Sequence, residues 1–161
     1  MKKMVLPLAV LAMAGLLLAA MAWDCVGLAA DARRRVALAD EEMQKHEVRL
    51  VKLLTGYPRR SPGVQAAIDA YLVTDGSQAR HDAYERVVAS FRQSMSGAVD
   101  PTNPLDRKFM DDVAGAMNRR EIAERQYGDE FAAYQAFLGG VRGGMARWFS
   151  SDARTDWKPG D

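Results

Sequence analysis

The sequence predicts an all-α protein: an antiparallel up-down helical bundle with long first and last helices and an N-terminal transmembrane helix. Three observations predict it. Apolar residues recur every three or four positions through most of the chain, which is the spacing of one helical face. No segment shows the sustained two-residue alternation of a strand. Short connections containing proline or glycine separate the helical segments, and short connections favour antiparallel neighbours.

The charge distribution suggests three parts: a membrane anchor over 1–23, a helical bundle over 24–149 and a polar flexible tail over 150–161. Beyond residue 30 the chain carries 20 Lys and Arg against 20 Asp and Glu, so the bundle has no net charge. This balance argues against nucleic-acid binding, which needs a basic surface to displace counterions. The charges alternate in sign, as is typical of solvated helix faces.

An unbroken apolar run from Met4 to Trp23 follows Lys2 and Lys3. At about 1.5 Å per residue, its length matches a hydrocarbon core roughly 30 Å thick. Trp23 at its end suits the membrane interface. We therefore expect an uncleaved anchor in contact with membrane lipid. The alternative is a signal peptide cleaved after the Ala20-Met21-Ala22 sequence, which resembles an A-x-A site.

Basic residues flank this run on both sides, with Lys2 and Lys3 before it and Arg33 to Arg35 after it. The numbers of positive charges on the two sides are therefore nearly equal, and they do not decide the orientation. We expect a single-pass protein of a bacterial cell membrane, with the bundle on the non-cytoplasmic side. Cys25 is the only cysteine, so it forms no intramolecular disulfide. Asp24 before it disfavours lipid attachment, which needs a small residue there.

The first bundle helix is expected to continue from the anchor and to end at Tyr57-Pro58, since the residue before proline disfavours the α region. Ser61-Pro62 begins a second helix, with serine as N-cap and proline at the first helical position. Asp75-Gly76-Ser77 predicts a turn, and a loop is expected over 97–103. The apolar positions expected to face the core are Val36, Ala39, Met43, Leu50, Leu54, Tyr57, Val64, Ala67, Ile68, Tyr71, Leu72, Tyr84, Val87, Val88, Phe91 and Met95.

The last helix, from about Leu105 to Phe149, is expected to be the longest and has a coiled-coil-like rhythm of apolar residues. Its aromatic residues have core spacing, although a ligand-binding strip is the alternative. The two glycine pairs in Gly139–Gly144 predict a loosened or kinked end. A phosphate loop is the other interpretation, but such loops open a helix instead of closing one.

Candidate catalytic and metal-ligating residues form no recognisable set. Neither His46 nor His81 has a second histidine or a cysteine one helical turn away, so we expect both to be solvated helix residues. The carboxylates of the last helix lack the Glu-x-x-His pattern of di-metal bundles and are expected to form a solvated acidic face. We therefore expect no enzyme activity, no cofactor and no metal.

The last helix carries a family resemblance. The run N-R-R-E-I-A-E-R-Q-Y-G-D-E-F-A-A-Y-Q resembles the C-terminal helix signature of the LemA family. The stretch from Val48 to Tyr57 is similar to that family's first conserved segment. Gly128 and Gln135 depart from the family pattern, which has Asn at both positions. The residues that fall on matching positions are Asn118, Ala123, Tyr127, Asp129, Phe131 and Tyr134.

The resemblance implies a membrane-anchored antiparallel bundle without known enzymatic activity. We therefore expect a scaffold or protein-interaction module in the cell envelope, whose protein partner and oligomeric state the sequence leaves undefined. The alternative is a secreted soluble bundle that binds a small ligand after signal cleavage.

The end of the last helix is expected to return to the membrane surface. Three turns separate this helix from the first and make the two antiparallel. Its length of roughly 65 Å exceeds the length of roughly 50 Å expected for the helical segment over 24–57. Apolar, aromatic and basic residues gather there, a mixture that suits the headgroup region. The alternative is that the aromatic residues cap the bundle core. With Trp23, the expected membrane-interface residues are Arg142, Met145, Arg147, Trp148 and Phe149.

Overall fold

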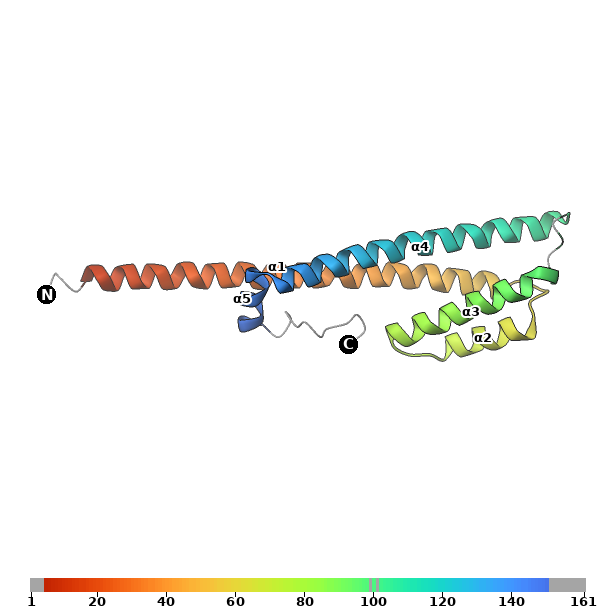
Figure 1. The fold of residues 1–161 in the computed structure, drawn as a ribbon, viewed down its shortest axis with the longest axis horizontal. Coiled ribbons are helices and arrows are strands. Elements are labelled where there is room, and N and C mark those ends of the chain that lie inside the picture. The colour runs from red at the N-terminus through yellow and green to blue at the C-terminus, as the bar shows by residue number, and fades with distance from the viewer. Residues whose placement is uncertain (1–4, 99, 101, 151–161) are drawn as a thin grey trace. The chain divides into compact units, whose positions relative to one another are not determined.

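The computed structural model describes residues 5–98, 100 and 102–150, and these are helical almost throughout, without a strand. The predicted all-α class is therefore confirmed. The expected tail, apart from Ser150, lies outside the described residues, as does the side chain of Met95. The helices are α1 (Val5–Thr55), α2 (Pro62–Leu72), α3 (Ser77–Ala98), α4 (Pro104–Gly139) and α5 (Val141–Phe149) (Figure 1).

The described chain divides into two compact units. Unit 1 combines residues 5–37 with 129–150, and unit 2 comprises residues 38–128. Both boundaries fall inside long helices, the first in α1 and the second in α4. The sequence suggested a bundle over 24–149 whose first helix continues from the anchor. Helix α1 continues through residue 23 without a break.

Unit 2 contains the main hydrophobic core, in which α2 and α3 lie side by side. The expected caps and turns position these helices. The Ser61 side chain accepts a hydrogen bond from the Val64 N–H at 3.3 Å, and proline follows at the first helical position. Gly76 has a φ of +87°, a conformation that favours glycine, so the predicted turn leads directly into α3. The core residues of α1 to α4 are Leu50, Val51, Leu54, Val64, Ile68, Tyr71, Ala83, Tyr84, Val87, Val88, Phe91, Val113 and Ala116.

Unit 1 buries mainly small residues of α1 and larger residues of α4. Tyr134 and Leu138 are fully buried on α4. A salt bridge joins the Arg35 Nε and Glu130 Oε2 atoms at 3.3 Å. The buried α1 residues, spaced three and four positions apart as on one helical face, are Ala22, Cys25, Ala29, Ala32 and Val36. The first of them lies inside the apolar segment, so burial within unit 1 begins before the expected end of the anchor.

The glycine-rich end of the last helix is broken, as the sequence predicted, so the segment expected over 105–149 consists of two helices. Helix α4 ends at Gly139, and Gly140 has an extended backbone (φ −84°, ψ 172°) before α5 begins. The glycine pair at the break has the lowest helix propensity after proline, so separating the two helices costs little there. With 36 residues, α4 is shorter than α1, which has 51. The second glycine pair does not interrupt the helix but lies within α5.

Gly143 allows the corner between α4 and α5. A Cβ atom at this buried position would overlap the Phe137 carbonyl oxygen and the Leu138 Cα, whereas a Cβ at Gly144 would meet nothing within 4 Å. Only glycine therefore lets the two helices approach this closely. Because a methyl group is excluded at Gly143 but meets open space at Gly144, the two neighbouring glycines form a matched pair for substitution.

Candidate membrane surface and buried charge cluster

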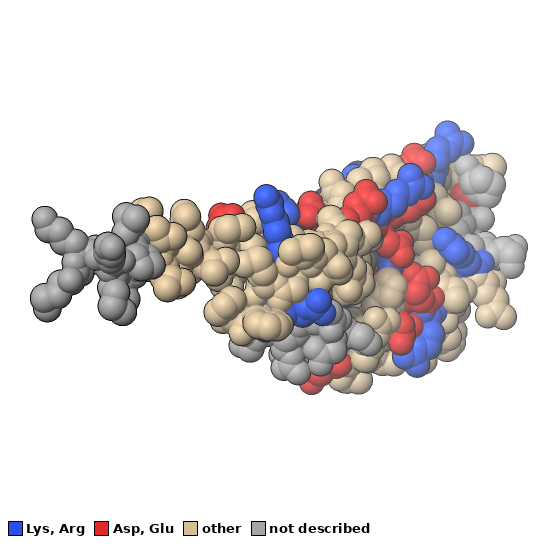
Figure 2. Space-filling view, turned by 60° about the vertical axis from the view of Figure 1, so that its left-hand side comes forward, with Lys and Arg blue, Asp and Glu red and all other residues tan. Residues whose placement is uncertain are grey.

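The first candidate site is the exposed apolar part of α1. The helix is long and apolar enough to cross a membrane, and its apolar residues from Val10 to Met21 are exposed. Leu11 is 71% exposed and Leu17 is 67% exposed. Figure 2 shows this part of α1 free of charged side chains. A water-facing helix of this composition is unfavourable, at about 25 cal/mol for each Å² of apolar surface.

Helix α5 supplies a second apolar surface, also within unit 1. Trp148 is 88% exposed and Phe149 is 66% exposed, although both belong to a helix that buries Gly143 and Ala146. A groove of about 570 Å³ runs between α5 and the apolar part of α1. Its lining residues are Leu18, Val141, Gly144, Met145, Arg147, Trp148 and Phe149.

The expected interface residues are therefore placed as follows. Trp23 is 83% exposed on α1, one position beyond the buried Ala22. The other five all belong to α5, and two of them are basic and exposed: Arg142 and Arg147. These five residues therefore lie on a separate short helix and not at the end of one long helix.

Unit 2 contains a buried charge cluster that the sequence analysis missed. The side chain of Glu47 on α1 is only 1% exposed, and that of Arg120 on α4 is 8% exposed. The Arg120 Nη2 atom lies 3.6 Å from Glu47 Oε1 and 3.2 Å from Glu85 Oε1 on α3. The Arg120 guanidinium also lies over the Tyr84 ring, 4.9 Å from its centroid, as in a cation–π contact. The cluster thus joins three helices.

His81 completes the cluster. Its Nδ1 atom lies 3.1 Å from Glu47 Oε1 and 2.9 Å from Arg120 Nη2. A protonated Nδ1 donates to the carboxylate, whereas an unprotonated Nδ1 accepts from the guanidinium. The Nε2 atom lies 3.2 Å from Arg120 Nη2, so the tautomer protonated on Nδ1 also leaves an acceptor for the guanidinium. Burial raises the pKa of the Glu47 carboxyl, although the hydrogen bond with His81 and the charge of Arg120 act in the opposite direction.

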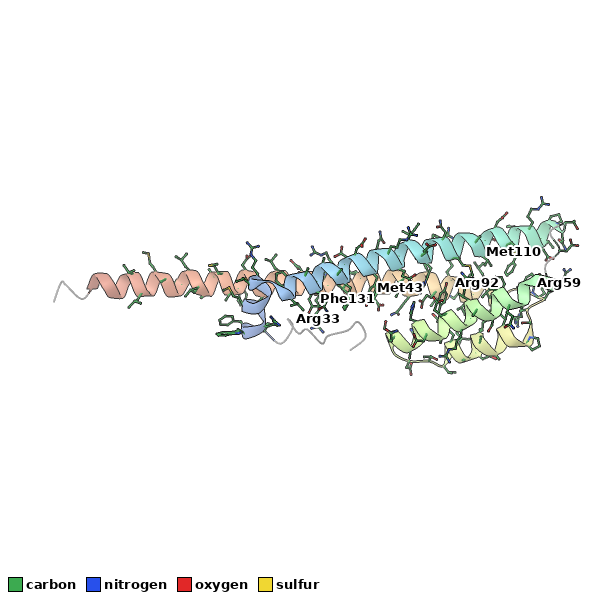
Figure 3. The ribbon with its side chains drawn as sticks, viewed as in Figure 1. Arg33, Met43, Arg59, Arg92, Met110 and Phe131 are labelled. Atoms are coloured by element: carbon green, nitrogen blue, oxygen red, sulfur yellow. The ribbon has the colours of Figure 1, made fainter. Side chains whose placement is uncertain are left out.

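Two further carboxylates are buried in unit 2. Asp40 on α1 accepts hydrogen bonds from Gln44 at 2.8 Å and from the Ser77 hydroxyl at 3.1 Å. Asp106 on α4 accepts from the Tyr57 hydroxyl at 3.3 Å and pairs with Arg59 at 3.0 Å. Figure 3 labels Arg59. Asp40 therefore links the beginning of α3 to α1, and Asp106 links the connection after α1 to α4.

The expectation that His81 is a solvated helix residue was wrong. Its side chain is 25% exposed and contacts two charged neighbours. His46 is less exposed still, at 19%, and lies 3.5 Å from Glu42 on its own helix, so it is not fully solvated either. The sequence did contain a signal for the cluster. Asp40 and Glu47 occur seven residues apart, at positions where the spacing of Val36, Met43, Leu50 and Leu54 calls for apolar residues.

The residues of the LemA resemblance lie along α4. Ala123 and Tyr134 are buried, and Tyr127 and Phe131 are partly buried, so core packing accounts for them. Asn118 and Asp129 are exposed. Phe131, labelled in Figure 3, is only partly buried, whereas Tyr134 on the same helix is fully buried.

The described residues contain no group of three or more His, Cys, Asp or Glu side chains suited to a metal ion. Arg120 neutralises the buried Glu47 carboxylate and links α4 to α1. No family model, curated protein or solved structure matches the chain. The LemA resemblance therefore stays a prediction from the sequence.

Tyr71 provides a test of burial beside the cluster. Its hydroxyl has no hydrogen-bond partner among the described residues, and burial raises its pKa to about 12. The native state therefore keeps a proton that the unfolded chain loses near pH 10, so stability falls as pH rises from about 10 towards 12. We expect Tyr71→Phe to leave stability at pH 7 nearly unchanged and to reduce the alkaline loss by about 2–3 kcal/mol. Urea unfolding at several pH values measures both; equal alkaline losses in the two proteins would contradict the burial of a neutral phenol.

Proposed function

We propose that this chain is a membrane-anchored helical-bundle protein that acts as a scaffold or protein-interaction module in the bacterial cell envelope. One observation carries the proposal: the helix that presents the exposed apolar residues from Val10 to Met21 also supplies Leu50 and Leu54 to the core of unit 2. The membrane segment and the folded unit thus share one helix. The bundle lies on the non-cytoplasmic side in this proposal.

The position of Ala22 supports an anchor over a cleaved signal. The peptide bond after Ala22 lies inside α1, and the Ala22 side chain is 5% exposed in unit 1. Cleavage there would remove a helical segment and one of the residues that unit 1 buries. A secreted soluble bundle that binds a small ligand remains the second candidate, and the mature N-terminus distinguishes the two.

We infer that α1 and α4 are antiparallel in unit 2. Glu47 contacts Arg120, whereas Tyr57, ten residues further along the chain, contacts Asp106 and stacks on Phe109 with ring centroids 4.1 Å apart. Residues later in the chain on the α1 side therefore contact residues earlier in α4, which is the order of antiparallel helices. This order agrees with the bundle that the LemA resemblance implies.

A groove along α1 in unit 2 supports the interaction role. The groove encloses about 650 Å³, and its apolar lining comes from Val48 and Leu53. The charged residues that line it carry both signs: Glu41, Lys45, Arg49 and Lys52. An amphipathic helix of a partner protein fits this chemistry, because its apolar face can enter the groove while its charged flanks pair with the rims.

Site-specific photo-crosslinking in native membranes tests this proposal. A photoreactive amino acid at Val48, which lines the groove, is expected to give a discrete adduct with one protein. The same amino acid at the exposed Gln78 on α3 serves as the matched control. Adducts of equal yield at both sites, or none at Val48, would contradict a partner in the groove.

A further inference from the structure

Helix α5 lies beside Leu18, and this position fixes how far along the apolar part of α1 the short helix sits. Leu18 lines the same groove as Met145, Trp148 and Phe149. It precedes Trp23, the expected interfacial residue, by five positions of continuous helix, or roughly 7–8 Å. Amphipathic helices that lie in a membrane interface bury their apolar face about 5–10 Å below the headgroup boundary. If α1 spans the membrane, the groove beside α5 lies within this range of depths.

The residues of α5 are distributed as an interfacial helix requires. Val141, Met145 and Trp148 follow one another at steps of four and three residues, so they share one side of the helix, and Phe149 adjoins them. Gly143 and Ala146 lie on the opposite side and are buried within unit 1. The apolar residues are therefore free to face lipid while the small residues pack against protein.

The two basic residues of α5 lie at the borders between these sides. At 3.6 residues per turn, Arg142 falls between Val141 and Ala146 around the helix, and Arg147 falls between Gly143 and Trp148. Both are exposed. Arginine at the flanks of an apolar face can extend its guanidinium to lipid phosphates while its stem stays on apolar surface.

We propose that α5 is a second membrane-docking element: a short helix whose apolar side enters the lipid interface, with Arg142 and Arg147 binding anionic headgroups. This proposal rests on the membrane anchor proposed above. The high exposure of Trp148 and Phe149 in unit 1 favours docking over the alternative in which these rings cap a core. Docking would fix the end of α4 at the bilayer, so the bundle would attach to the membrane at two places.

Depth-dependent quenching of Trp148 fluorescence tests the proposal on the full chain. Replacing Trp23 and Trp157 by phenylalanine leaves Trp148 as the only tryptophan. The protein is reconstituted in vesicles of phosphatidylcholine, alone or mixed with phosphatidylglycerol, and its association is measured separately by flotation. We expect quenching by lipids labelled near the headgroup, weaker quenching by labels at the bilayer centre, and stronger quenching when phosphatidylglycerol is present.

One pair of variants and one double variant sharpen the test. Gly143→Ala should move α5 and weaken the quenching, whereas Gly144→Ala, where the added methyl group meets open space, should not. The double variant Arg142→Gln and Arg147→Gln should remove the difference between the two vesicle compositions while leaving flotation unchanged. A persisting difference would contradict headgroup binding by these arginines.

The outcomes separate this proposal from the anchor. A protein that floats with the vesicles while Trp148 remains unquenched refutes docking by α5 and leaves the anchor intact. A protein that does not float refutes both. Quenching of equal strength in the Gly143→Ala and Gly144→Ala variants would overturn the placement of α5 described above.

Discussion

Arg120→Met is expected to lower the free energy of unfolding by about 3–5 kcal/mol, since it removes one partner of a buried ion pair. The Glu47 side chain is 1% exposed and would lose the guanidinium that neutralises it. His81 would remain beside the carboxylate, 3.1 Å away. Because burial raises the pKa of the Glu47 carboxyl, and a protonated carboxyl needs no counter-charge, the loss should be smaller at pH 5 than at pH 8. Urea unfolding in detergent micelles, followed by circular dichroism, measures both values.

Arg125→Met is the matched control. Arg125 also lies on α4 and also pairs with a glutamate one turn away, Glu121, but both side chains are more than half exposed. Exposed pairs of this kind contribute about 0.3–0.5 kcal/mol. If Arg120→Met destabilised the protein no more than Arg125→Met does, the buried cluster would not hold the helices together. The double variant Glu47→Leu and Arg120→Met should recover much of the loss, because the buried carboxylate is removed together with its partner, and the other glutamates beside Arg120, Glu85 and Glu124, are about half exposed.

Substituting arginine for both Leu11 and Leu17 is expected to move the protein from the membrane fraction to the soluble fraction. Each arginine near the middle of a membrane-spanning helix opposes insertion by about 2.5–3.5 kcal/mol, so the pair opposes it by about 5–7 kcal/mol. Both leucines are exposed, so the substitution removes little packing within the protein. Alkaline carbonate extraction of membranes, followed by immunodetection, measures the distribution.

Leu72→Arg with Val73→Arg provides the control for this substitution. These residues are also exposed and apolar, at 66% and 80%, but they lie at the end of α2 in unit 2. The control should remain in the membrane fraction. Retention of the Leu11 and Leu17 variant to the same extent would mean that the apolar part of α1 does not anchor the chain.

Local sequence signals predicted most helix boundaries correctly. The serine and proline that begin α2 and the glycine turn before α3 act through their own backbone geometry, so a few residues suffice to identify them. A local cap also marks the start of α4, where the Asn103 side chain accepts a hydrogen bond from the Leu105 N–H at 2.9 Å. The loop expected over 97–103 begins later in the structure, because α3 continues to Ala98.

The charge cluster was missed for a physical reason. A single charged residue on a helix looks solvated until its partners are known, and those of Glu47 lie 34 and 73 positions away at His81 and Arg120. The heptad spacing of α1 could have drawn attention to Asp40 and Glu47 as polar residues at core positions, but it names no partner. Close packing at Gly143 likewise depends on neighbours that sequence spacing does not reveal.

The mass of the intact protein recovered from carbonate-washed membranes tests the central claim most directly. For this purpose Gln78→Cys in a Cys25→Ala background is treated, in intact cells, with a maleimide that cannot cross the inner membrane. We expect the full chain from its initial residues to carry one label, because the proposal leaves α1 uncleaved and places unit 2 away from the cytoplasm. A soluble product that begins at Trp23 would contradict the anchor, and a full-length membrane product that is labelled only after permeabilisation would reverse the orientation.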